Sequence, residues 1–167
     1  RCDGSFLLLK DGGRDTVRRE LLASAVCQCF DIPQVLYESG VYADEPVTRS
    51  RIITSKDRSI VPMRAFEVHC TNEELDYLEE VIRLDPVSYY GMNILDYLTG
   101  NTDRHMENWG LWVDNDTNEP ISLHPLMDFN QCFGAYDTLD GANCLTVGKR
   151  RISQRQAAIE AVLPGGY

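Results

Sequence analysis

The pattern of apolar and polar positions changes near residue 70. Before it, apolar residues fall in short runs bounded by glycine, proline and polar residues, which favours strands and turns around one helix. After it, they recur three and four positions apart, which favours helices. We therefore predict an α+β chain with a small mixed lobe at residues 1–70 and a mainly helical lobe at residues 71–167.

The first lobe is expected to contain a strand, a helix and further strands. Phe6–Lys10 is an apolar run that ends in a cation, and Asp11–Gly13 forms the turn after it. A helix is expected to begin at Asp15 or Thr16 and to end before Ile32-Pro33. Its apolar face would consist of Val17, Leu21, Leu22, Ala25, Val26, Cys29 and Phe30, with Glu20 at the edge. Extended stretches are expected at residues 35–41, 51–54 and 59–68, with Pro46 in a loop between the first two.

The second lobe is expected to contain helices and one hairpin. Thr71–Glu74 has the sequence of a capping box and should begin a helix. Asp85-Pro86 ends that helix and starts the next, because proline suits the first helical turn. That next helix should end at Gly100. A hairpin is expected at residues 109–113 and 121–123, and a final helix at residues 153–162.

A group of polar residues follows the helix that ends at Gly100. Asp103 and Asn108 lie five positions apart, and Asp128 comes just after the expected hairpin. Phosphoryl transfer needs a carboxylate near the attacking hydroxyl and oxygen ligands that hold Mg²⁺ against the ATP phosphates. Mg²⁺ takes one or two protein carboxylates and keeps several waters. Asp103 is therefore a candidate catalytic group, and Asn108 and Asp128 are candidate Mg²⁺ ligands.

Each of these residues also has a structural interpretation. An isolated Asp103 would be a turn aspartate that hydrogen-bonds its own backbone, and Asp128 would cap the end of the hairpin. His105 is a further candidate catalytic residue, although a lone histidine more often braces a loop. The occurrence of Asp103, Asn108 and Asp128 around one hairpin favours the catalytic interpretation.

Lys10 and Glu20 complete the expected site. A lysine at the end of a strand, held by a helix glutamate and directed at the ATP phosphates, is the partner that such a loop requires. A solvated lysine at the strand end is the alternative. Arg64 and Arg104 are additional candidates for contacts with phosphate or substrate.

Charge and composition narrow the choice of function. The net charge of −10 argues against general nucleic-acid binding or a basic membrane anchor, but Mg²⁺ and local cations still permit ATP. None of the six cysteines forms a CxxC pair, and His69 and His124 have no partner at metal-binding spacing, so no zinc site is expected. Reduced, buried thiols are favoured over disulfides. We find no membrane-spanning run or leader and expect a cytoplasmic protein.

The segment Gly100-Asn101-Thr102-Asp103-Arg104-His105-Met106-Glu107-Asn108-Trp109-Gly110, followed by Pro125-Leu126-Met127-Asp128-Phe129-Asn130, resembles HipA-like serine/threonine kinases. Those proteins carry a G-N-x-D-x-H-x-x-N loop and a later P-x-x-D-F segment. The order of Lys10, Glu20 and Ile32-Pro33 is also similar. This resemblance implies a kinase-like fold, with Asp103 as catalytic base, Asn108 and Asp128 on Mg²⁺, and Lys10 on the ATP phosphates. It also implies that Phe66, Glu67 and Val68 contact adenine through backbone groups at a hinge.

The resemblance implies ATP-dependent phosphate transfer to a serine or threonine of a protein. The tripeptide Asp103-Arg104-His105 is also similar to the loop of phosphoinositide 3- and 4-kinases, which keeps a lipid or small-molecule kinase open. The glycine-rich loop that covers the ATP phosphates in kinases is not found before Lys10, and the metal-binding segment reads Asp-Phe-Asn in place of Asp-Phe-Gly. A catalytically silent nucleotide-binding or regulatory module is therefore a third hypothesis.

Overall fold

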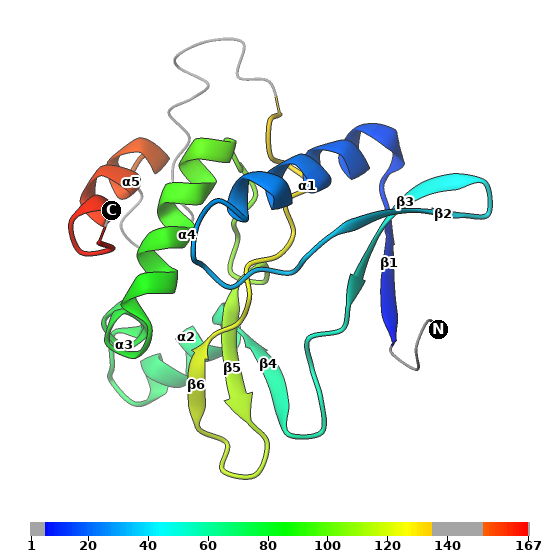
Figure 1. The fold of residues 1–167 in the computed structure, drawn as a ribbon. Helices are drawn as coiled ribbons and strands as arrows, with labels where there is room; N and C mark the ends of the chain where they lie inside the picture. Colours follow the sequence, from blue (N-terminus) through cyan, green and yellow to red (C-terminus); the bar gives the residue numbers. More distant parts are fainter. Residues whose placement is uncertain (1–5, 135–151, 167) are drawn as a thin grey trace.

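A computed structural model of the chain describes residues 6–134 and 152–166 (Figure 1). These residues form two antiparallel sheets of three strands each, surrounded by helices. The first sheet has the order β1 (Leu7–Asp11), β3 (Glu45–Arg51) and β2 (Glu38–Tyr42). The second has the order β4 (Arg58–Pro62), β5 (Gly110–Asp114) and β6 (Pro120–Leu123). The helices are α1 (Gly13–Cys27), α2 (Met63–Asn72), α3 (Tyr77–Leu84), α4 (Pro86–Thr99) and α5 (Gln154–Val162).

Helix α1 follows β1 and packs on β3, but its start and its buried face differ from the prediction. It begins at Gly13, whose backbone N–H donates to the carboxylate of Asp11 at 3.3 Å. Its buried residues are Val17, Glu20, Ala23, Ser24 and Cys27. Leu22, expected on the apolar face, is 49% exposed. The helix presents small and polar side chains to the sheet because the facing positions on β1 and β3 include Lys10 and Thr48.

The strands of the first lobe are also shifted from their predicted ranges. The stretch 35–41 forms a strand only from Glu38, and the stretch 51–54 lies mostly beyond the end of β3. Pro46 lies in β3 opposite Val41 and not in a loop. A proline near the start of a strand is tolerated because the sheet ladder is only beginning there.

The stretch 59–68 was wrongly predicted to be extended throughout. The strand ends at Pro62, and Phe66, Glu67 and Val68 lie inside α2. The helix starts here because the backbone N–H groups of its first two residues find acceptors in the loop between α4 and β5: Met63 donates to Trp109 at 2.9 Å and Arg64 to Met106 at 3.1 Å. Glu67 and Val68 therefore lack the extended backbone on which their predicted adenine contact depended.

The expected capping box at Thr71–Glu74 is wrong as well. The Thr71 hydroxyl donates to the Glu67 carbonyl within α2, and α3 is capped instead by Asp76. The carboxylate of Asp76 accepts the backbone N–H of Leu78 at 2.8 Å. A cap five residues further along fits the sequence equally well, since aspartate and threonine both accept such bonds.

The remaining elements predicted after residue 70 agree with the structure. Asp85 caps α4, Pro86 is its first residue, and Gly100 ends it in the left-handed conformation with φ of 60°. The hairpin β5–β6 and helix α5 are where the sequence placed them, to within one or two residues. Strand β4 pairs with β5, so the second sheet contains one strand from before residue 70.

The main hydrophobic core joins the two halves of the chain. It contains residues of α1, of α2 to α4, of the β5–β6 hairpin and of the segment after β6. Its largest fully buried apolar side chains are Tyr77, Phe129, Met63, Leu95, Leu111 and Leu126. The segment after β6 is thus anchored by Leu126 and Phe129 on either side of Asp128, which fixes the backbone at a candidate site residue.

The cysteines support the expectation of buried, reduced thiols only in part, because one free thiol is exposed. Cys27 and Cys132 are buried free thiols, and burial raises the pKa of each to about 12. Cys29 is exposed. Cys2 and Cys144 lie outside the described residues.

Gly110 provides a test of how the two sheet strands and α2 are held together. A Cβ atom at this position would lie 2.2 Å from the Val61 carbonyl oxygen and 2.9 Å from the Pro62 Cα. Because both neighbours are backbone atoms, Gly110→Ala should lower the free energy of unfolding by about 2 kcal/mol or more in urea denaturation. Gly40→Ala is the matched control, since its new Cβ meets the flexible Val47 side chain at 3.3 Å. An equal loss in both variants would contradict this account.

Candidate functional site

Three residues from distant parts of the sequence meet at the end of β1. The Lys10 Nζ donates to the Glu20 Oε1 at 3.0 Å and also to the Asp128 Oδ1. Lys10 and Glu20 are 10 positions apart, whereas Lys10 and Asp128 are 118 apart. The structure therefore brings together three of the residues that the sequence analysis had proposed.

Glu20 is held by hydrogen bonds from two sides. Its side chain is 1% exposed, and its Oε2 accepts the Thr48 hydroxyl at 2.6 Å. Thr48 lies opposite Lys10 in the β1–β3 register, so both donors come from the same face of the first sheet. A buried carboxylate is costly unless it is paired and hydrogen-bonded, and here each oxygen has a donor. Glu20 thus fixes the position of the lysine.

Lys10 is a stable cation at the edge of the site. Partial burial acts to lower its pKa, but the hydrogen bond to Asp128 and the negative charge of Glu20 outweigh burial and raise the pKa above 10.5. The side chains of Lys10 and Asp128 are 31% and 29% exposed. An anion from solvent can therefore reach the ammonium group.

Asp128 is held in an uncommon backbone conformation. Its φ is 60°, in the left-handed region that few non-glycine residues adopt. Its backbone N–H donates to the Tyr37 hydroxyl at 3.1 Å, and the Tyr37 ring packs edge-on against Phe129. Burial raises the pKa of Tyr37, so the phenol stays protonated. These contacts direct the Asp128 carboxylate toward Lys10.

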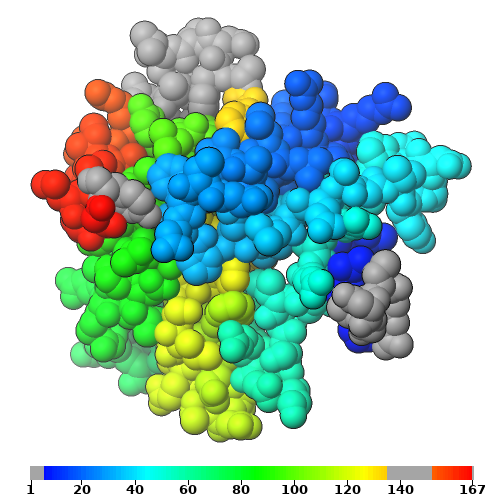
Figure 2. Space-filling view, viewed as in Figure 1, coloured from blue at the N-terminus to red at the C-terminus, as the bar shows by residue number. Residues whose placement is uncertain are grey.

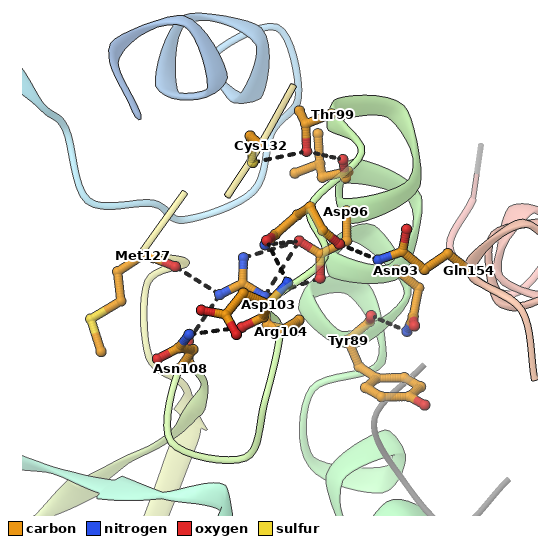
Figure 3. Close-up of polar contacts among 12 residues, drawn as sticks. Tyr89, Asn93, Asp96, Thr99, Asp103, Arg104, Asn108, Met127, Cys132 and Gln154 are labelled. Atoms are coloured by element: carbon orange, nitrogen blue, oxygen red, sulfur yellow. Dashed lines mark hydrogen bonds and ion pairs between the residues drawn. The ribbon is translucent and has the colours of Figure 1, made fainter. Parts of the chain in front are cut away.

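Asp103 and Asn108 belong to one hydrogen-bonded loop (Figure 3). The Asn108 Nδ2 donates to the Asp103 backbone carbonyl at 2.8 Å, and the Asp103 backbone N–H donates to the Asn101 Oδ1 at 3.1 Å. Because the amide nitrogen of Asn108 is used within the loop, its oxygen is the atom suited to a metal ion. One amide oxygen and one carboxylate match the donors that Mg²⁺ takes from proteins.

Arg104 joins this loop to the segment that carries Asp128. Its guanidinium donates to the Asn108 carbonyl at 2.9 Å and to the Met127 carbonyl at 2.7 Å (Figure 3). It also forms a two-pronged ion pair with Asp96 of α4, at 3.0 Å for both shorter contacts. Burial acts to lower the pKa of Arg104, and Asp96 reverses the effect and raises it. The candidate contact between Arg104 and phosphate or substrate is wrong, because the side chain is 8% exposed and committed to internal acceptors.

Several residues that support the site were not predicted from the sequence. Asp96 accepts from Arg104 and from the Asn101 side chain at 2.9 Å, and Gln154 of α5 donates to the Asn101 carbonyl. The role of Asp96 could have been predicted from the sequence, because it lies next to the apolar positions Ile94 and Leu95 of a helix. A carboxylate at such a buried position needs a cation as its partner. For Gln154 and Thr48 the sequence carries no comparable signal.

Two other candidate residues, His105 and Arg64, form hydrogen bonds that do not involve Lys10. The His105 Nδ1 accepts the Glu107 backbone N–H at 3.2 Å, which is the loop-bracing arrangement. Arg64 is paired with Glu67 at 2.9 Å along α2. Within residues 6–134 and 152–166, no three histidine, cysteine or acidic side chains gather in a group that would hold a metal ion.

Comparison with known proteins supports the fold. No protein-family model and no curated protein sequence matches the chain. A crystal structure of the proinflammatory kinase CtkA from Helicobacter pylori is similar, with a TM-score of 0.71 and 15% sequence identity over 97% of this chain and 74% of that one. The chain has a kinase-like fold. At this identity the likeness establishes the architecture and confirms the predicted mixed α and β kinase-like class.

The buried ion pair between Arg104 and Asp96 can be tested by stability measurements. Asp96→Asn leaves the guanidinium charge buried without its carboxylate, so we expect the free energy of unfolding to fall by about 3 kcal/mol or more. Glu80→Gln is the matched control, because it breaks the pair with Arg83, whose side chain is 75% exposed. That change should have little effect on the free energy of unfolding, because solvent screens an exposed pair. Similar losses in the two variants would show that Arg104 does not anchor the loop.

Proposed function

We propose that the chain is an ATP-dependent phosphotransferase of the HipA-like serine/threonine kinase type. One observation supports this most strongly: the Lys10 ammonium contacts Glu20 of α1 and Asp128 after β6 at once. Kinases need a strand lysine paired with a helix glutamate, and a metal-binding aspartate, in place together. A solvated lysine at a strand end would have no reason to bridge two carboxylates.

Each residue then has a separate role. Lys10, steadied by Glu20, would bind the ATP phosphates, while Asp128 and Asn108 would hold Mg²⁺. Held by these two residues, a metal ion would supply positive charge that offsets the negative charge developing on the phosphate during transfer. Asp103 would orient the acceptor hydroxyl and take its proton as general base. His105 would keep the loop in shape through its bond with Glu107.

The adenine contact is better assigned to the linker between the two sheets than to α2. Residues 52–57 connect β3 to β4 and lie outside regular secondary structure. Asn115 of the hairpin turn holds this linker, since its Nδ2 donates to the Lys56 carbonyl at 2.9 Å and its Oδ1 accepts the Ser59 hydroxyl at 2.7 Å. A backbone segment held in this way suits recognition of a flat base edge.

A protein serine or threonine is the proposed acceptor, in keeping with the resemblance of the loop at Gly100–Gly110. The negative charge of the chain disfavours approach to an anionic membrane surface, as a lipid kinase would need. No helix in the described part of the chain has the length and apolar character required to cross a bilayer.

Transfer of labelled γ-phosphate tests the proposal. The purified chain is incubated with labelled Mg-ATP, alone and with a generic protein substrate, and labelled phosphoserine and phosphothreonine are measured. We expect transfer by the wild type. Asp103→Ala should reduce it by about 10²-fold or more, because general-base catalysis contributes that much. Asp128→Ala and Lys10→Met should also reduce it strongly, by removing a metal ligand and the phosphate-binding cation.

The matched control is Asp116→Ala, which removes an exposed carboxylate in the hairpin turn. It should transfer phosphate at the wild-type rate. Absence of transfer in the wild type, despite thermal stabilisation by ATP, would overturn the kinase proposal in favour of a silent nucleotide-binding module. Transfer that survives Asp103→Ala and Asp128→Ala would show that the assigned site is wrong.

A further inference from the structure

An open groove lies between α1 and the start of β3, away from the Lys10 site. It has a volume of about 490 Å³ and is lined by Arg14, Val17, Arg18, Leu21, Leu22 and Pro46. The first five residues come from one side of α1, and Pro46 comes from the sheet. Figure 2 shows α1 in blue beside the cyan β2–β3 hairpin.

Apart from Arg14 and Arg18, the residues that line the groove are apolar. Leu22 is 49% exposed although it lies on the helix that packs against the sheet. Val41, which is 75% exposed, is paired with Pro46 across the β2–β3 ladder, and directly paired residues in an antiparallel sheet point to the same face. The apolar surface therefore continues from the groove onto the hairpin. Apolar residues gathered in this way commonly mark a binding surface.

The rim of the groove carries two positive charges in a chain of net charge −10. Arg14 and Arg18 are four positions apart, so they lie on the same side of α1. Both are exposed, and among the described residues neither forms an ion pair. The two arginines can therefore pair with the carboxylates of a bound segment.

We propose that this groove binds an acidic peptide segment of a partner protein, one whose carboxylates alternate with large apolar side chains. The apolar side chains would enter the groove between Leu21, Leu22 and Pro46, and the carboxylates would pair with Arg14 and Arg18. The charge of the rim selects an acidic partner over a basic one, and the negative surface elsewhere repels that partner from other sites. A segment bound here contacts the helix that carries Glu20 without touching Lys10 or Asp128.

Fluorescence anisotropy with defined peptides tests the proposal. The probe is a fluorescein-labelled twelve-residue peptide in which glutamates alternate with leucine and phenylalanine. A second peptide has lysine in place of each glutamate, and a third has serine in place of each apolar residue. We expect the folded chain to bind the first peptide more tightly than the other two. Raising the salt concentration should weaken that binding.

Charge reversal in the groove supplies the decisive variant. Arg14→Glu/Arg18→Glu should weaken binding of the acidic peptide by about tenfold or more, since two ion pairs are replaced by two repulsions. Both side chains are exposed, so the variant should keep the circular dichroism spectrum and melting temperature of the wild type. Lys56→Glu/Arg155→Glu makes the same change in net charge at two exposed positions outside the groove and should leave binding unchanged.

Three results would overturn the proposal. These are no binding of the acidic peptide, equal binding of the basic peptide, and equal weakening in the two charge-reversal variants. Sedimentation gives a further check. If the chain itself forms oligomers that Arg14→Glu/Arg18→Glu converts to monomers, the groove is occupied by a second copy of the chain and the partner assignment is wrong. None of these results depends on phosphate transfer, so the docking surface is tested independently of the proposed activity.

Discussion

The guanidinium of Arg104 is the constraint on which the site depends most. It is buried, and it joins helix α4 through Asp96, the loop through the Asn108 carbonyl, and the segment before Asp128 through the Met127 carbonyl. These three pieces come from different parts of the sequence, and the guanidinium ties them together through directional bonds. Because each of its nitrogens has an acceptor, the buried charge stabilises one arrangement and penalises any other. Arg104 thus binds the backbone carbonyl of one proposed Mg²⁺ ligand, Asn108, and the carbonyl of Met127, which precedes the other, Asp128.

A second buried charge, the carboxylate of Glu20, holds neighbouring elements in position in the other half of the molecule. Glu20 is fully enclosed, and it is held by Thr48 and Lys10. The cost of burying this carboxylate is offset only while the first sheet and α1 stay in register, since both donors lie on that sheet. The Lys10–Asp128 contact then connects the two halves. The fold is similar to that of CtkA although only 15% of the aligned residues are identical.

The sequence predicted those parts of the molecule whose signals are local. The proline and glycine at the ends of α4 define it, and the polar turn between β5 and β6 defines the hairpin. Lys10, Glu20 and Asp128, which the structure brings into contact, were proposed together because phosphoryl transfer needs a lysine, a glutamate that holds it and a metal-binding aspartate. Helix α2 was missed because its start depends on acceptors at Met106 and Trp109, more than forty positions away. The buried role of Arg104 was missed for the same reason, since only the folded chain shows that Asp96 is next to it.

The most direct test of this account is calorimetric titration of ADP and a non-hydrolysable ATP analogue, with and without Mg²⁺, into the wild type and Asp128→Asn. Asp128 contacts Lys10 in the structure, and the account assigns the same carboxylate to the metal ion. The wild type should therefore bind nucleotide more tightly with Mg²⁺ than without it, and Asp128→Asn should lose most of that difference while still folding. Nucleotide binding that is indifferent to Mg²⁺ in both proteins, or absent from both, would contradict the assignment of Lys10, Asn108 and Asp128 to one phosphate-binding site.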